Sequence, residues 1–237
     1  MELITYQQVG STQDVARQVT AAGHPLPFAI AAATQSAGRG RDGKSWNSPP
    51  GGLWLTTAFD VPSAAAVQQA AMAAAQGVAA VLTTQTGLQA VVKWPNDLLL
   101  HRRKVCGILA ETLVAPERTT LLLGIGLNVN NAVSQQQLPR ATSVSWELGH
   151  TLELEPITRA IVDILDLNID ILVQHGFHAF SAWMNDNLAL RGELVTIEFN
   201  NQHDVGRVTG VSETGGLLLQ QQDGSLSEIS AGSIYLW

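Results

Sequence analysis

The segment most suited to chemistry is a cationic, glycine-rich loop at residues 38–46. Its glycines allow backbone N–H groups to approach a ligand closely. Arg39, Arg41 and Lys44 supply positive charge in a chain whose formal net charge is −7. Trp46 adds a flat apolar face, so the loop indicates a site for an anion that carries an aromatic ring, such as a nucleotide. A solvated surface loop is the alternative from this segment alone.

The same loop matches two nucleotide-binding patterns. Residues 38–43 fit G-x-G-x-x-G, and residues 38–45 fit G-x-x-x-x-G-K-[ST]. Both patterns need a helix directly after the loop, because the helix N-terminus holds the phosphates. Residues 46–52 contain two prolines and two glycines, which prevent a normal helix. We therefore expect neither a dinucleotide fold nor a P-loop.

A second unusual segment, Lys-Trp-Pro-Asn-Asp at residues 93–97, follows an apolar strand. Strand ends are positions at which sheets present functional side chains, and Asp97 is a candidate ligand for Mg²⁺, which prefers carboxylate and phosphate oxygens. A plain turn would also explain this segment. In a third segment Lys104 begins a strand, and Gly107 permits close approach of a ligand or another backbone. A solvated Lys104 is the alternative there.

The elements that must position these segments form two groups. Apolar runs predict strands at residues 3–6, 28–34, 53–59, 91–94, 98–100, 104–113 and 120–129. Helices are expected over residues 11–22 with Ser11 as N-cap, from about 64 to a stop at Gly87, and over 156–174 and 177–187. Four closely spaced strands at 194–199, 205–211, 217–222 and 233–236 indicate a small barrel. We expect an α+β fold, with a mixed β-sheet packed with helices in residues 1–188 and a small β-barrel in residues 189–237.

Composition excludes several classes of protein. The chain has 237 residues, 13 Lys+Arg against 20 Asp+Glu, and one cysteine, Cys106. The acidic balance argues against general nucleic-acid binding, which needs a basic footprint. The sequence has no signal-peptide pattern and no apolar run near the roughly 20 residues that span a bilayer. We expect a cytoplasmic protein without membrane contact, in which Cys106 is a buried small residue.

These segments, in this order, resemble the biotin–protein ligase family. The matching stretches are residues 10–13, 34–49, 93–97, 104–111 and 124–130, and the C-terminal strands resemble the family's SH3-like domain. The resemblance implies a class II synthetase-like catalytic domain and biotin–[acetyl-CoA-carboxylase] ligase activity. In that reaction the carboxylate of biotin attacks the α-phosphate of MgATP to give biotinyl-5′-AMP and pyrophosphate. A lysine of a biotin carboxyl carrier protein then takes the biotinyl group and releases AMP.

The resemblance also assigns roles to individual residues. Biotin is expected to bind to Ser11, Thr12, Gln13, Gln35, Gly38, Arg39, Gly40, Arg41, Lys104 and Gly107. Arg39, Arg41 and Lys104 are the expected catalytic cations, because two anions must be held together. ATP is expected to bind to Trp46, Lys93, Asn96 and Asn128, with Asp97 on the magnesium ion. ATP and Mg²⁺ are thus co-substrates, and no tightly bound cofactor is expected.

The sequence departs from the family pattern at a few positions. Gln13 stands where the family usually has Asn, and Asp42 and Lys44 stand where arginines are usual. Asp42 should weaken phosphate binding unless Arg41 or Lys44 pairs with it. About ten residues precede the Ser-Thr motif, so we expect no helix-turn-helix and no specific DNA binding. The family also allows a homodimer that forms through sheet edges.

Three rival functions stay open from the sequence. A lipoate– or octanoate–protein ligase or transferase has the same fold and also acylates a carrier lysine, although the Gly-Arg-Gly-Arg loop favours biotin. A P-loop NTPase would hydrolyse nucleotide without biotin. A non-catalytic biotin-binding module would need neither Lys104 nor Asp97. Biotin-dependent exchange of labelled pyrophosphate into ATP, with lipoate as the control, separates these functions.

Overall fold

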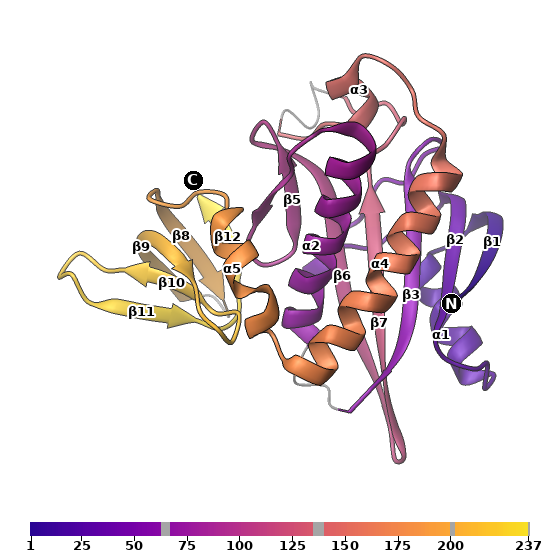
Figure 1. The fold of residues 1–237 in the computed structure, drawn as a ribbon, viewed down its shortest axis with the longest axis horizontal. Helices are drawn as coiled ribbons and strands as arrows, with labels where there is room; N and C mark the ends of the chain where they lie inside the picture. Colours follow the sequence, from indigo (N-terminus) through magenta and orange to yellow (C-terminus); the bar gives the residue numbers. More distant parts are fainter. Residues whose placement is uncertain (63–66, 135–139, 200–201, 237) are drawn as a thin grey trace.

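The computed structural model describes residues 1–62, 67–134, 140–199 and 202–236, and its larger sheet has seven strands (Figure 1). The strand order is β1-β2-β3-β7-β6-β5-β4. These strands are β1 (Glu2–Val9), β2 (Phe28–Gln35), β3 (Leu53–Val61), β4 (Val91–Lys93), β5 (Asp97–Leu100), β6 (Arg103–Ala115) and β7 (Arg118–Leu127). β1 and β2 are parallel and the other neighbours are antiparallel, so the expected mixed sheet is confirmed.

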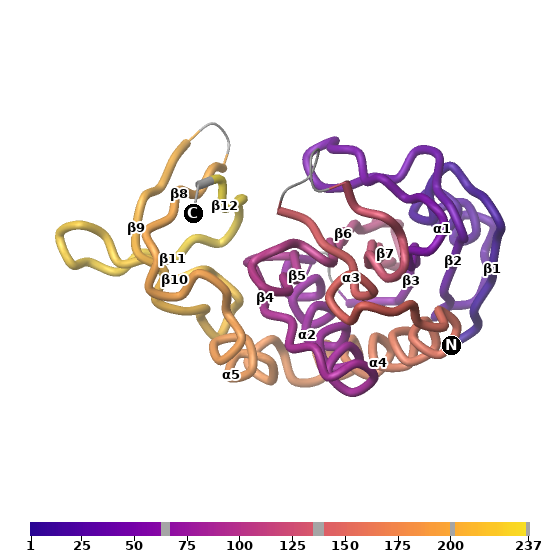
Figure 2. Tube along the Cα trace, turned by 90° about the horizontal axis from the view of Figure 1, so that it is seen from above, coloured from indigo at the N-terminus to yellow at the C-terminus, as the bar shows by residue number. Residues whose placement is uncertain are grey.

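Helices cover both faces of this sheet. They are α1 (Thr12–Ala21), α2 (Val67–Thr86), α3 (Val144–Leu148), α4 (Leu154–His175) and α5 (His178–Asp186). Successive residues of a strand face opposite sides, and in β2 Ala29 belongs to the core under α2 and α4, whereas Phe28 and Ile30 pack under α1. Figure 2 shows α1 on the side of the sheet opposite α2 and α4.

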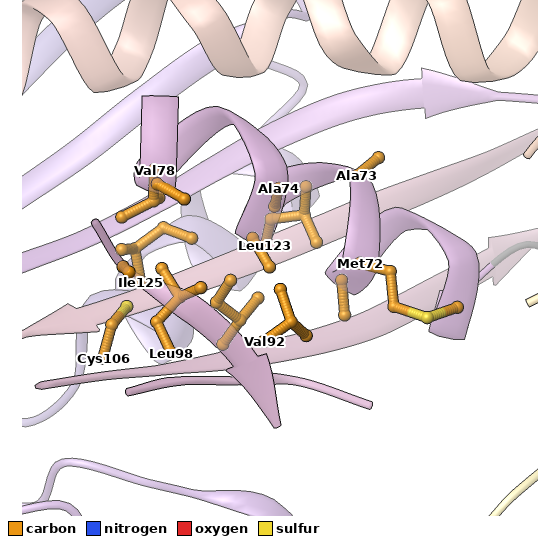
Figure 3. Close-up of a cluster of buried hydrophobic side chains, with 14 of the residues drawn as sticks. Met72, Ala73, Ala74, Val78, Val92, Leu98, Cys106, Leu123 and Ile125 are labelled. Atoms are coloured by element: carbon orange, nitrogen blue, oxygen red, sulfur yellow. The ribbon is translucent and has the colours of Figure 1, made fainter. Parts of the chain in front are cut away.

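The main core lies between the sheet and α2. Met72 and Val78 of α2 belong to one buried cluster with Leu98 of β5 and Leu123 of β7, and the many alanines of α2 let the helix approach the sheet closely (Figure 3). Cys106 is fully buried in the same cluster, as expected. Burial raises the pKa of its thiol far above the usual range, which argues against a nucleophilic role.

Local signals explain the start of α1 and the end of α2. The Ser11 hydroxyl accepts a hydrogen bond from the Gln13 N–H at 3.3 Å, which confirms the expected N-cap of α1. Gly87 has φ +75° and its N–H bonds to the Thr83 carbonyl, which ends α2. The expected start of α2 at about residue 64 lies outside the described residues. The short helix α3 was not expected.

The second sheet is small and antiparallel. Its order is β11-β10-β9-β8-β12, with strands β8 (Leu194–Phe199), β9 (Gln202–Val211), β10 (Leu217–Gln220), β11 (Leu226–Ile229) and β12 (Ser233–Leu236). The expectation of a small C-terminal β domain is confirmed. The sequence missed β11, because Leu-Ser-Glu-Ile is too short and polar to form an apolar run.

Specific contacts hold the small sheet beside the large one. The Trp94 indole N–H donates to the Gly215 carbonyl at 3.0 Å, and the side chain of Asn185 makes two 2.9 Å bonds to the backbone of Val211. Ser233, the first residue of β12, lines the site described below. None of the helices among the described residues combines the length and the apolar character needed to span a bilayer.

Candidate active site

A cavity of about 540 Å³ lies on the α1 face of the large sheet, beside the N-terminus of that helix. Gly107 of β6 and Gly124 and Gly126 of β7 form part of its floor. A Cβ at Gly126 would lie 2.5 Å from the Trp46 indole nitrogen, and one at Gly107 would lie 3.0 Å from the same ring. Glycine is required here because any side chain would occupy the space taken by Trp46.

All but two of the sequence-predicted site residues line this cavity. The predicted residues that line the cavity are Ser11, Thr12, Gln13, Gln35, Arg39, Gly40, Arg41, Trp46, Asn96, Asp97, Lys104, Gly107 and Asn128. The exceptions are Gly38 and Lys93. Gly38 packs under the loop, where a Cβ would lie 2.4 Å from the Trp46 carbonyl oxygen, so this glycine permits the fold of the loop. Burial lowers the pKa of Lys93, and the nearby Asp97 carboxylate opposes that shift.

The glycine-rich loop forms a small hairpin. The Trp46 N–H donates to the Gly38 carbonyl at 2.8 Å, and the Gly40 N–H donates to the Lys44 carbonyl at 2.7 Å. These bonds fold the loop back on itself and carry the indole over the sheet. The segment after Ser45 contains no helix before β3 begins, as the sequence predicted. The arrangement that a P-loop requires is therefore absent from this described segment.

Two left-handed residues close the hairpin. Asp42 has φ +56° and Gly43 has φ +71°, and the Lys44 N–H bonds to the Arg41 carbonyl at 3.1 Å across this turn. Aspartate and glycine adopt positive φ more readily than arginine does. Asp42, which replaces an arginine of the family pattern, therefore suits the turn conformation.

The first arginine of the loop is held by carboxylates. An Arg39 guanidinium nitrogen lies 2.8 Å from Asp14 of α1 and 3.4 Å from Glu111 of β6. Glu111 also pairs with Arg17 at 3.1 Å. Arg39 is thus neutralised at the edge of the cavity and ties the loop to α1 and β6.

The second arginine has neutral partners. Arg41 donates to the Asn96 side-chain oxygen and to the Gly232 carbonyl, each at 3.0 Å. Gly232 directly precedes β12, and its neighbour Ser233 lines the cavity. Since neither partner carries charge, Arg41 keeps its positive charge available for an anionic ligand.

Lys104 occupies the centre of the site. Its ammonium lies 2.7 Å from an Asp97 carboxylate oxygen and 5.0 Å from the centroid of the Trp46 ring. A cation over an indole face at this distance makes a favourable cation–π contact. In the described part of the chain, no three His, Cys, Asp or Glu side chains gather as metal ligands do. Asp97 therefore fits magnesium only together with oxygens that a ligand brings.

One end of the cavity is a buried network of hydroxyls and amides. The Thr12 N–H and hydroxyl both donate to the Gln35 amide oxygen, at 2.8 and 3.1 Å. The Thr56 hydroxyl lies 2.9 Å from both the Thr12 hydroxyl and the Gln13 amide oxygen. The Gln13 amide nitrogen faces the carbonyls of Leu109 and Leu122 at 3.4 Å, so its amide is already engaged within the protein.

Sequence reasoning missed several residues of the cavity. Thr56 is fully buried on β3, where a threonine in an apolar strand gave no distinct signal. Asn131 follows the matched Gly-Ile-Gly-Leu-Asn-Val-Asn stretch directly, and its position was the available clue. The other missed residues are Ser45, Asn47, Leu55, Ile108, Leu109, Gly124, Ile125, Gly126, Ala132, Val133, Ser134, Ala141 and Ser233. Asp42 and Lys44, which the sequence analysis placed beside the phosphate site without assigning them a ligand, also line the cavity.

Comparison with known proteins agrees with this geometry. Residues 5–130 match the model of the Biotin/lipoate A/B protein ligase family, and residues 192–237 match the Biotin protein ligase C terminal domain. The chain belongs to the biotin/lipoate A/B protein ligase family. The second match places it with the biotin protein ligases in that family, and the predicted family, fold and enzyme class are confirmed.

Individual relatives of this biotin protein ligase cover most of its length. The Bifunctional ligase/repressor BirA of Bacillus subtilis (strain 168) is 29% identical over 233 residues, covering 94% of this chain and 70% of the relative. The Biotin--[acetyl-CoA-carboxylase] ligase of Paracoccus denitrificans is 30% identical, with 81% and 83% covered. The structure of the Aquifex aeolicus biotin protein ligase in complex with biotin and ATP has a TM-score of 0.88 and 26% identity, and covers 100% of this chain and 98% of that one.

Proposed function

We propose that this chain activates biotin as biotinyl-5′-AMP with MgATP and transfers it to a lysine of a biotin carboxyl carrier protein. The observation that supports this most directly is one cavity with three chemically distinct parts. It has a hydroxyl and amide end, a cationic middle under an indole, and an asparagine end. The match to the biotin protein ligase C-terminal domain favours biotin over lipoate or octanoate.

The three parts follow the direction of β7. Gly124 and Gly126 share one side of the sheet because side chains alternate along a strand, and Asn128 directly follows β7. The three residues span about 13 Å. A Cβ at Gly124 would lie 3.0 Å from the Gln13 amide, and Gly126 lies under Trp46. A substrate laid along this line places the ureido ring of biotin near Gly124, the joined acid groups near Gly126 and the nucleobase near Asn128.

The hydroxyl and amide end suits a cyclic urea. A ureido ring has one carbonyl acceptor and two N–H donors. The Ser11 hydroxyl can donate to the carbonyl, while the Gln35 amide oxygen can accept from a ring N–H in exchange for its bond to Thr12. Gln13 supports this end through the strand carbonyls and Thr56. Buried groups of this kind reject a ligand that leaves them unpaired.

The middle of the cavity performs the first step. A biotin carboxylate oxygen attacks the α-phosphorus of ATP, a C–O–P linkage forms, and the bond to the bridging oxygen of pyrophosphate breaks. Arg41 and Lys104 stabilise the charge that gathers there, and each charge-assisted hydrogen bond contributes about 1.5–3 kcal/mol. Arg39, already paired with two carboxylates, acts as an anchor for the loop.

Magnesium enters this proposal with the nucleotide. Mg²⁺ usually binds one or two carboxylates together with substrate phosphates. Asp97 is the carboxylate placed for that role once Lys104 turns toward the acid groups. The ion supplies charge neutralisation on the phosphates, while the residues of this chain orient the attacking carboxylate.

The second step transfers the acyl group. A neutral lysine amine of the carrier protein attacks the acyl carbon of biotinyl-5′-AMP, an amide bond forms, AMP leaves and the amine loses its proton to solvent. Most residues of the hairpin at residues 38–46 line the cavity, so the hairpin can shield the mixed anhydride from water before the carrier arrives.

Biotin-dependent exchange of labelled pyrophosphate into ATP tests the activity. We expect exchange with biotin and none with lipoate, and a loss of about 100-fold or more in Arg41→Ala and Lys104→Ala. Arg159→Ala is the matched control, because this exposed cation on α4 pairs with Glu155 of the same helix. Exchange supported by lipoate, or nucleotide hydrolysis without biotin, would contradict the proposal.

Further parts of the proposal have their own tests. We assign catalysis to residues 1–188, a C-terminal domain to residues 189–237, and a cytoplasmic location. The proposal also includes a homodimer that forms through sheet edges, and analytical ultracentrifugation measures the mass of the particle in solution. Specific DNA binding is not expected, and a gel shift with a defined operator would overturn that expectation.

A further inference from the structure

The lysines of this chain are few, and they gather at the site. Of the 13 Lys and Arg residues only three are lysines, Lys44, Lys93 and Lys104, although lysine is among the commonest residues of proteins. Lys44 and Lys104 line the cavity, and Lys93 is paired with Asp97 across β4 and β5. The remaining cations of this kind are arginines, whose guanidinium groups stay protonated and do not act as nucleophiles. A reagent that acylates amines therefore meets lysine in this chain only near the cavity.

The proposed function, on which this inference rests, places such a reagent in the cavity. Biotinyl-5′-AMP is a mixed anhydride of a carboxylic acid and a phosphoric acid, and its acyl carbon reacts with a neutral amine. An amine on a side chain of the same cavity is a tethered reactant, whose effective concentration exceeds that of an amine in solution. Which of the three lysines reacts then depends on how each amine is held.

Two of the three lysines have other contacts or another place. The Lys104 ammonium lies 2.7 Å from an Asp97 carboxylate oxygen and 5.0 Å from the centroid of the Trp46 ring. Lys93 is half-buried on β4, outside the set of described residues that line the cavity. Lys104 thus serves as a cation of the site, and Lys93 contributes no surface to the cavity.

Lys44 differs from both. Its side chain is exposed and lines the cavity, and its ammonium makes no hydrogen bond or ion pair with any residue that the structure describes. Its charge acts within the site, because it adds to the lowering of the Lys93 pKa that burial mainly causes. Lys44 also stands where the family pattern has an arginine, so this chain presents an amine at a position that usually carries a guanidinium.

The hairpin holds the backbone of this lysine at the cavity. The Lys44 N–H donates to the Arg41 carbonyl at 3.1 Å, and the Lys44 carbonyl accepts from the Gly40 N–H at 2.7 Å. Beyond this anchored backbone, the side chain is a flexible stem of four carbons. The amine can therefore sweep the cavity wall while its attachment point stays fixed.

We propose that Lys44 is a modification site, whose Nζ takes the biotinyl group from the adenylate of the same chain when no carrier protein is present. The neutral amine attacks the acyl carbon, and a C–N amide bond forms. The bond between that carbon and the phosphate oxygen breaks, AMP leaves, and the proton of the amine passes to solvent. The product is a chain that carries biotin in amide linkage on its glycine-rich hairpin.

Intact mass and peptide mapping test this site. The full chain is incubated with biotin and MgATP, without a carrier protein. We expect one biotinyl group per chain, on Lys44, at a rate that stays constant over about a 10-fold range of protein concentration, because the reaction is intramolecular. Lys44→Arg keeps the cation and removes the nucleophile, so the labelling rate should fall at least about 10-fold. Lys44→Gln is the second variant, in case Lys44→Arg does not fold by thermal denaturation.

The control and the contrary outcomes are distinct. Arg159→Lys introduces an amine on the exposed surface of α4, outside the residues that line the cavity, and position 159 should be labelled at least about 10-fold more slowly than Lys44. Equal labelling of position 159, labelling of Lys93 or Lys104 in place of Lys44, or a rate that rises with protein concentration would overturn the inference. So would an unlabelled chain that still exchanges pyrophosphate with biotin, a result that leaves the proposed function intact. Absence of that exchange contradicts the proposed function itself.

Discussion

Gly107 of β6 and Gly126 of β7 lie directly opposite each other, and the Trp46 indole packs across both. The indole nitrogen of Trp46 is buried and has no acceptor among the described residues. The loop therefore brings an aromatic ring onto a stretch of sheet that lacks side chains. A ligand that enters this part of the cavity must share the surface with the ring or move it.

The variant Gly126→Ala tests whether this packing matters for activity. A Cβ there would lie 2.5 Å from the indole nitrogen, so Trp46 must shift. We expect biotin-dependent pyrophosphate exchange to fall by about 10-fold or more, with a change in tryptophan fluorescence. The double variant with Trp46→Ala should be no worse than Trp46→Ala alone, because the clash is gone. Unchanged exchange in Gly126→Ala would show that the position of the indole is unimportant.

The two arginines of the loop should differ in their effects. Arg39→Ala removes an anchor that is already neutralised by Asp14 and Glu111, so we expect less than about a 10-fold loss of exchange and a loss of stability of about 0.5–1 kcal/mol. Arg41→Ala removes a cation with neutral partners and should cost far more activity. Steady-state kinetics and urea denaturation measure the two quantities. Equal losses of activity would contradict the separation of roles.

Asp42 offers a test of charge against conformation. Asp42→Arg adds a cation near the phosphate site and should slow dissociation of the bound adenylate, although φ +56° disfavours arginine there. Asp42→Asn removes the negative charge and keeps the turn, so it should slow dissociation about 2- to 5-fold without loss of stability. Release of biotinyl-5′-AMP, followed by stopped flow, gives the rates. Unchanged rates of biotinyl-5′-AMP release in both variants would show that Asp42 does not affect retention of the adenylate.

Stability at low pH should depend on Glu147. Burial alone would raise the pKa of its carboxyl, but hydrogen bonds from Thr142 and His101 and the charge of Arg103 hold the pKa below the usual 4.5. A carboxylate whose pKa is lowered by folding stabilises the protein above its unfolded pKa, and that stabilisation is lost as the pH falls through the folded value. We therefore expect the free energy of unfolding to decline below about pH 4.5.

The variant Glu147→Gln isolates this contribution. It should be less stable than the wild type at neutral pH and should show a shallower decline in acid, by urea denaturation at a series of pH values. Glu155→Gln, on an exposed pair with Arg159, is the matched control and should leave both quantities unchanged. An identical acid slope in Glu147→Gln and the wild type would rule out this carboxylate as the cause.

Much of the site could be predicted because the sequence itself signals its chemistry. A run of glycines and arginines, a bend with a carboxylate and a lysine before a glycine are unusual, and the strands that carry them lie side by side. Asp97 and Gly107, for example, are paired across β5 and β6. The sheet was predictable for the same reason, since apolar runs determine strands.

Other features depend on contacts between distant segments and left no local signal. The carboxylates that hold Arg39 come from α1 and β6, and nothing in the loop reveals them. Thr56 and Asn131 are ordinary polar residues until β3 and the segment after β7 place them in the cavity wall. The strand β11 forms because β10 offers it a partner, despite its polar sequence.

The hydrogen bond from Arg41 to the Gly232 carbonyl joins two parts of the chain that are 191 residues apart. If Arg41 swings toward a phosphate, that bond breaks, and the turn before β12 loses a tether. Because such coupling is reciprocal, a partner that displaces this turn must also change the affinity for the nucleotide. A carrier protein that displaces this turn when it binds the small sheet thus changes the affinity for the nucleotide, and the bound nucleotide changes the affinity for the carrier protein by the same factor.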